Sequence, residues 1–197
     1  MEHHDTVLWR RVDQPGHEWA RLSVVEQEWR LEGTAVFAHL GRPCRLDYAV
    51  GCDADWNTLR ARITGSVADR SIDLTVTVDA SRHWRLNGAE YPEVAGCIDI
   101  DLGFSPSTNL LPIRRLGLDV GDEAEVRAAW LPFPSLEFKL LPQRYIREGE
   151  HTYRYESSGG AFERTLRVNS IGLVTEYPGI WVREDADTAP RQDIDAR

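Results

Sequence analysis

Cysteine is scarce in this sequence of 197 residues, which contains only Cys44, Cys52 and Cys97. No two of them form a CxxC pair, which argues against a zinc ribbon or a thioredoxin-type redox site. A small, odd number of thiols favours free, buried cysteines in a reducing compartment, so we expect a cytoplasmic protein. Residues 1–10 have no apolar core and do not resemble a signal peptide. No run of about 18 apolar residues occurs, so we expect no membrane span.

Basic residues are in deficit, because 23 Lys and Arg face 32 Asp and Glu, for a net charge of -9. Nucleic acids and anionic lipid surfaces both attract basic patches, so this balance argues against either partner. It does not exclude an apolar lipid held in a cavity, because burial of apolar surface needs no surface charge.

The motifs of common catalytic and metal sites are missing. The six histidines show no HxxxH or HExxH spacing, and none pairs in sequence with a cysteine. There is no GxSxG elbow, P-loop or GxGxxG segment. We therefore predict no metal and no cofactor, assign no catalytic residue, and favour a binding function over an enzymatic one.

Alternation of apolar and polar residues with period two is the dominant pattern that is present. Such alternation is typical of strands with one buried and one wet face. Short turn signals separate the runs, and no helical pattern reaches ten residues, so an all-β, antiparallel meander, barrel or roll is expected. We predict one domain over residues 1–183 and a disordered, acidic tail over 184–197. The alternation is clearest in residues 29–37, 46–52, 72–78, 98–102, 124–130 and 136–140.

One segment breaks this alternation and predicts a short helix over residues 108–115. Ser107, Thr108 or Asn109 would cap it, and Pro112 is tolerated only in its first turn. Its leucines, Leu110 among them, cannot all face water, so the segment is expected to pack into the concave side of the sheet.

Two pairs of charged residues are candidates for a polar site. Asp99 and Asp101 would share one face of a strand, where they could bind a cation or a sugar hydroxyl, or pair with an arginine of the helix. Arg114 and Arg115 are adjacent and would point about 100° apart, so that one contacts a ligand while the other ties the helix to the sheet. For both pairs the structural interpretation is favoured over the functional one.

Aromatic residues are the other candidates, because rings stack on sugars and line apolar pockets. They are also common in strand cores, which is the simpler interpretation of any single ring. Trp130, Tyr145 and Tyr177 are the three that we expect to line a cavity.

Three segments in the middle of the chain, GCIDIDL at 96–102, SPSTN at 105–109 and LPIRRL at 111–116, stand out together. Shorter matches follow at AAW (128–130), QRY (143–145), YRY (153–155) and GLV (172–174). Over about residues 21–183, the sequence resembles a bacterial family of putative glycolipid-binding proteins. The resemblance implies an antiparallel β-roll or open barrel around one short helix, similar in shape to the carriers that shuttle the acyl chains of lipoproteins. It implies no catalytic residue.

The leading hypothesis is a binding protein for a lipid-like or glycolipid-like molecule, with an apolar tail buried between the concave sheet and the helix. An enzyme with a site around Asp99, Asp101 and Arg114 is one alternative, and a protein-interaction module is another. The sequence does not indicate whether the protein is a monomer or an oligomer. The residues expected to contact the ligand are Trp130, Tyr145, Tyr177, Leu110, Arg114, Asn109, Asp99 and Asp101.

Overall fold

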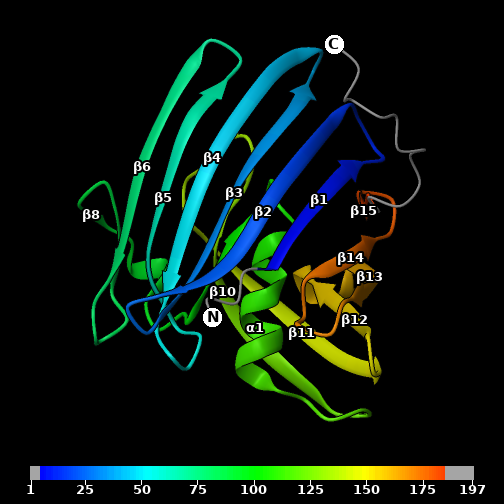
Figure 1. The fold of residues 1–197 in the computed structure, drawn as a ribbon. Helices are drawn as coiled ribbons and strands as arrows, with labels where there is room; N and C mark the ends of the chain where they lie inside the picture. Colours follow the sequence, from blue (N-terminus) through cyan, green and yellow to red (C-terminus); the bar gives the residue numbers. More distant parts are fainter. Residues whose placement is uncertain (1–4, 185–197) are drawn as a thin grey trace.

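The computed structural model describes residues 5–184, and its strands form one fifteen-stranded sheet. The sheet order is β8-β7-β6-β5-β4-β3-β2-β1-β15-β14-β13-β12-β11-β10-β9, with every neighbouring pair antiparallel except β9 and β10. Figure 1 shows the long strands β1 to β6 running side by side. The strands are β1 (Asp5–Arg11), β2 (Gly16–Val25), β3 (Glu28–His39), β4 (Arg42–Cys52), β5 (Thr58–Val67), β6 (Arg70–Val78), β7 (Trp84–Leu86), β8 (Ala89–Glu90), β9 (Asp99–Leu102), β10 (Glu123–Leu131), β11 (Lys139–Gly149), β12 (Thr152–Ser157), β13 (Phe162–Val168), β14 (Val174–Tyr177) and β15 (Trp181–Arg183).

The alternation in the sequence corresponds to the burial observed along most strands. In β6, Ile72 and Val76 are buried whereas Asp73, Thr75 and Thr77 are exposed. One face of the sheet therefore meets the core and the other meets water, as the period of two predicts. The expected all-β, mostly antiparallel fold around one short helix is confirmed.

Two strands at the N-terminal end were not expected from the sequence. In β1, Trp9 is fully buried and its indole N–H donates to the Val174 carbonyl at 2.7 Å. Its neighbour Leu8 and Trp19 of β2 are partly exposed, and such outward-facing apolar residues hide the alternation. β1 pairs with both β2 and β15, so it joins the two ends of the chain in the middle of the sheet.

The edge strand β9 lies inside the roll rather than at the solvent. The Thr58 amide donates to the Ile98 carbonyl at 3.2 Å, and the Ile100 amide donates to Thr58 Oγ1 at 3.2 Å. These contacts from the start of β5 cover an edge that would otherwise expose unpaired backbone groups. The two faces of β9 then meet different surroundings, with Ile100 and Leu102 in the main core.

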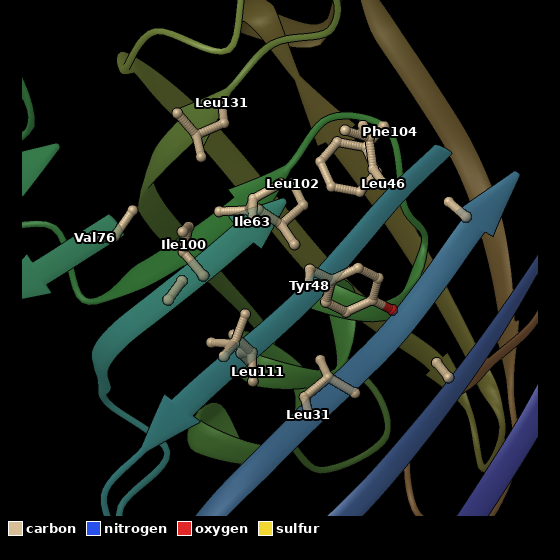
Figure 2. Close-up of a cluster of buried hydrophobic side chains, with 14 of the residues drawn as sticks. Leu31, Leu46, Tyr48, Ile63, Val76, Ile100, Leu102, Phe104, Leu111 and Leu131 are labelled. Carbon is tan, nitrogen blue, oxygen red and sulfur yellow. The ribbon is translucent and has the colours of Figure 1, made fainter. Parts of the chain in front are cut away.

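Side chains fill the concave side of the sheet. Figure 2 shows Leu31, Leu46 and Ile63 of β3 to β5 packed against β9, the loop after it and the helical segment. The largest fully buried side chains include Leu31, Leu46, Ile63, Ile100, Leu102, Phe104, Leu110, Leu111 and Leu131. The space that the sequence assigned to an apolar tail is therefore occupied by the protein itself.

The predicted helix is present as a 3-10 turn, η2 (Ser107–Asn109), followed by α1 (Leu110–Leu116). Pro112 lies in the first turn, and Gly117 ends the helix with a left-handed φ of 55°. The expectation of a side-chain cap was wrong, because the preceding turn already continues into the helix and no cap hydrogen bond forms. Two further short turns are η1 (Pro92–Val94) and η3 (Ser158–Gly160). No helix within residues 5–184 is long and apolar enough to span a bilayer.

The predicted strand over residues 136–140 was wrong at its start. β11 begins only at Lys139, and Leu136 has a φ of 56° within the preceding connection. Leu136 and Phe138 are nevertheless buried in the core. The alternation there reflects loop side chains packing inward. Of the predicted tail, only Glu184 lies within the described residues, and its amide donates to the Leu8 carbonyl at 2.8 Å.

All three thiols are free and buried, as the sequence predicts. Burial raises the pKa of Cys52 to about 12 and that of Cys97 to about 11, which leaves almost no reactive thiolate at neutral pH. We expect an Ellman-type reagent to label none of the three in the native protein and all three after unfolding. Rapid labelling of the native protein would contradict this packing.

Candidate functional site

An open cleft of about 310 Å³ lies between the β9 end of the sheet and the C-terminal strands. β9, β10, η2 and the loop after β9 form one part of it, and strands β11 to β15 form the rest. Five of its lining residues are aromatic, namely Trp130, Tyr155, Phe162, Tyr177 and Trp181. The others are Asp101, Gly103, Ser105, Asn109, Leu141, Ser157, Ser158 and Ile180.

The parallel pairing of β9 with β10 places an acid beside an indole at this cleft. Asp101 and Trp130 are direct partners in the register, so both side chains project from the same face. The alternate residues Leu102 and Leu131 project from the other face into the main core. Gly103 permits the close approach of Trp130, because a Cβ at this position would lie 2.7 Å from the indole Nε1. Any larger residue at 103 would displace that ring.

Asp101 is half-buried, and one of its oxygens has a partner within the protein. Gln143 Nε2 donates to Asp101 Oδ2 at 2.6 Å and lies 3.0 Å from the Tyr155 hydroxyl. Burial raises the pKa of Asp101 to about 6, and the bond from Gln143 opposes this shift. At pH 7 the side chain is therefore mainly a carboxylate with acceptor capacity left over.

A buried acid lies directly behind the cleft. Glu18 of β2 is 0% exposed, and its Oε1 accepts hydrogen bonds from the Ser105 hydroxyl and from the Tyr48 hydroxyl, the latter at 2.6 Å. Tyr48 also contacts the Ser107 hydroxyl at 2.7 Å. Among the described residues, the second carboxyl oxygen, Oε2, has no hydrogen-bond partner. Burial raises the pKa of Glu18 to about 8, despite the two hydroxyl donors, so this side chain is mostly neutral at pH 7.

Asn109 and Tyr145 support the floor of the cleft. The Tyr145 hydroxyl donates to Asn109 Oδ1 at 3.0 Å, and Asn109 Nδ2 donates to the Pro106 carbonyl at 3.1 Å. Both amide atoms of Asn109 are therefore engaged within the protein. The Tyr145 ring also packs against Tyr155 with a centroid distance of 5.2 Å. Tyr145 is buried behind the lining residues, where it fixes the positions of Asn109 and Tyr155.

The structure brings some of the predicted ligand residues together and separates the others. Asp101, Asn109, Trp130 and Tyr177 line the cleft, with Tyr145 behind them. Leu110 is fully buried in the main core. Arg114 lies 5.2 Å above the ring of Trp56 and lines a different cleft of about 240 Å³ beside Arg147 and His151.

Asp99 and Asp101 have separate partners. Asp99, 1% exposed, accepts a bidentate pair of hydrogen bonds from Arg115 at 3.1 and 2.5 Å, whereas Asp101 is bound by Gln143. The ion pair ties α1 to β9, in agreement with the structural interpretation of the sequence. Within residues 5–184, no group of three or more His, Cys, Asp or Glu side chains is placed to hold a metal ion.

Sequence reasoning did not single out Glu18 as part of the site. Its position in the alternation of β2 is the signal that could have revealed it, because Glu18, like Ala20 and Leu22, faces inward. An acid on the buried face of a strand needs partners from elsewhere in the chain. In the sequence, Ser105 was visible only as part of the SPSTN segment, and Trp181 only as one of the seven tryptophans.

Comparison with known proteins shows the family of this chain. Residues 6–183 match the family described as "Putative glycolipid-binding". The chain belongs to this family. The match extends the sequence resemblance toward the N-terminus and includes β2 with Glu18.

A solved structure is similar to this family member over most of its length. It is a DUF1089 family protein from Pseudomonas aeruginosa, with 36% sequence identity and a TM-score of 0.73. The alignment covers 85% of this chain and 92% of the other. No curated protein matches the chain.

Proposed function

We propose that this protein binds a lipid-like molecule through a sugar headgroup that enters the cleft between β9–β10 and β12–β15. The observation that carries the proposal is the combination of aromatic rings with polar atoms that have no hydrogen-bond partner among residues 5–184. Small-molecule sites are typically mostly apolar, with a few polar groups that fix orientation. The family description points to the same chemistry.

The rings supply flat apolar surfaces for a sugar. Trp130 and Tyr177 are half-buried, so part of each ring remains accessible from the cleft. Tyr155, Phe162 and Tyr177 pack edge to face with centroid distances of 6.1 to 6.3 Å, which holds them in place before a ligand arrives. Rings that are already ordered lose little side-chain entropy on binding.

Three polar atoms around these rings are open to sugar hydroxyls. Asp101 Oδ1 is an acceptor, Trp130 Nε1 is a donor, and the Tyr177 hydroxyl can do both. Within the described residues, none of these atoms makes a hydrogen bond to another side chain or to the backbone. A site built to satisfy hydroxyl groups discriminates strongly against ligands that lack them, because its polar atoms would then be desolvated without a partner.

The apolar part of the ligand is placed at the rim rather than in the core. The cleft volume is near the lower end of the range for ligand pockets, which suits a headgroup better than a whole lipid. The core beneath it is filled, so the first carbons of a tail would contact Leu141, Phe162 and Ile180. The proposed position of the tail therefore differs from the one expected from the sequence, which was between the concave sheet and the helix.

Calorimetric titration with octyl β-glucoside below its micelle concentration tests the proposal. We expect saturable binding, and Trp130→Ala should weaken it by about tenfold, which corresponds to about 1.4 kcal/mol. Trp29→Ala is the matched control, because Trp29 is half-buried and stacks on Trp56 outside the cleft. Absence of binding, or equal losses in the two variants, would contradict the proposal.

A further inference from the structure

We infer that the headgroup taken by this cleft is a neutral sugar, and that sugars bearing a carboxylate or a phosphate are rejected. The inference rests on the proposed function and adds the chemical class of the ligand. Its basis is the charge arrangement around the cleft, where one acid faces the ligand space and basic side chains do not.

Asp101 supplies the negative charge within the cleft. It is half-buried, and its Oδ1 is left for a ligand while Gln143 occupies Oδ2. Within the described part of the chain, no Arg, Lys or His lines this cleft. An anionic group held among these rings would therefore meet a like charge in a partly desolvated space, where charges interact more strongly than in water.

Two basic side chains that contact aromatic residues of the cleft have partners outside it. Arg164 stacks on the Phe162 ring at 4.6 Å and donates to the carbonyls of Pro178 and Glu163 at 3.2 and 2.6 Å. Arg11 lies 4.9 Å above the Trp181 ring and donates two hydrogen bonds to Asp13, at 2.9 and 2.7 Å. Each guanidinium contacts an aromatic lining residue without being part of the lining itself. A phosphate in the cleft would lack the bidentate partner that usually recognises it.

The buried acid behind the cleft offers an anionic ligand no compensating positive charge. Glu18 reaches the cleft wall through Ser105, and its unpartnered Oε2 is fully buried. Arg11 lies close enough to Glu18 to act on its charge, but it does not form a hydrogen bond to it within the described structure. Because Glu18 is mostly neutral at pH 7, an anion beside Ser105 would gain no attraction from it, whereas a sugar hydroxyl can donate to Ser105 Oγ, whose own proton is given to Glu18.

Two ligands that differ in one group isolate the effect of charge. Octyl β-glucoside and octyl β-glucuronide share the ring and the tail, and differ by a hydroxymethyl group against a carboxylate. At pH 7 we expect the glucoside to bind at least ten times more tightly, as measured by calorimetry. Equal or tighter binding of the glucuronide would overturn the inference and leave the proposed function standing. Binding of neither ligand would refute the proposed function itself.

The role of Asp101 is tested by substitution and by pH. Asp101→Asn keeps an acceptor for Gln143 and removes the charge, so the preference for the glucoside should fall at least threefold. In the wild-type protein, lowering the pH from 7 to 5 protonates Asp101 and should narrow the same preference, while the glucuronide stays charged. Glu18 is already mostly protonated over this interval, and burial keeps the pKa of Tyr145, Tyr155 and Tyr177 above the usual range. Burial also raises the pKa of Asp99 despite its pairing with Arg115, so the same pH series on Asp101→Asn separates the two carboxyl groups, and the effect of pH should be absent from that variant. An unchanged preference in both experiments would overturn the assignment of Asp101.

The same rings and carboxylate raise one rival chemistry, the recognition of a quaternary ammonium group. Octyltrimethylammonium is therefore included as a third ligand under the same conditions. Weaker binding of this cation than of the glucoside supports a neutral sugar. Tighter binding of the cation would overturn the inference, and would assign the cleft to a cationic headgroup.

Discussion

Replacing Arg115 by methionine is expected to lower the free energy of unfolding by roughly 3 to 5 kcal/mol. The reason is that Asp99 is 1% exposed and Arg115 is its bidentate partner, so the variant leaves an uncompensated charge in the interior. Urea denaturation at pH 7, followed by tryptophan fluorescence, measures the change.

The double variant Asp99→Asn, Arg115→Met separates the charge from the packing. We expect it to recover much of the loss, because no buried charge remains to be compensated. Arg42→Met is the surface control. Arg42 pairs with Asp69 at the exposed end of β4, so its loss should cost less than about 1 kcal/mol. A cost for Arg115→Met as small as that of the control would show that the pair does not hold α1 to β9.

The second large effect is a fall in stability as the pH rises, caused by Glu18. Burial raises its pKa from 4.5 in the unfolded chain to about 8 in the fold. Below pH 4.5 both states hold the proton, and between 4.5 and 8 only the native state does. The free energy of unfolding therefore falls as the pH increases through this interval, and the contribution of Glu18 is lost above it. At about 1.4 kcal/mol per pKa unit, the part lost between pH 6 and pH 8 is roughly 2 kcal/mol.

Glu18→Gln removes this titration and keeps the shape of the side chain. We expect its free energy of unfolding to change little between pH 6 and pH 8, so that the variant becomes more stable than the wild type at the alkaline end. Asp101, whose pKa is raised to about 6, titrates mainly below this range and is shared by both proteins. If the two proteins show parallel pH profiles, the alkaline loss has another origin.

The strands of the fold were predictable because burial of one face leaves a period of two in the sequence. That signal failed for β1 and β2, where Leu8 and Trp19 occupy outward positions. It also misled over 136–140, where loop residues turn inward without forming a strand. The helical segment was predictable from its proline and its leucines, but its capping depends on η2, whose geometry the residue types do not specify.

The candidate site was only partly predictable, because its residues come from several strands that are separated in the sequence and brought together only by the fold. The local alternation placed Asp101 and Trp130 on strands, but only the parallel pairing of β9 with β10 brings them side by side. Tyr177 reaches the same cleft from β14, which is separated from β10 in the sheet by β13, β12 and β11. Arg114 and Arg115 are adjacent in sequence, and their different directions on α1 give them different partners.

A nitrogen-proton NMR titration of the tryptophan indoles with octyl β-glucoside tests the central claim most directly. The Trp130 and Trp181 indole signals should shift as the ligand is added, because both rings line the cleft. The Trp84 signal should stay in place, since that ring is fully buried and its N–H donates to the Cys97 carbonyl at 2.9 Å. Shifts confined to Trp29 and Trp56, or no shift at any indole, would contradict a sugar site between β9–β10 and β12–β15.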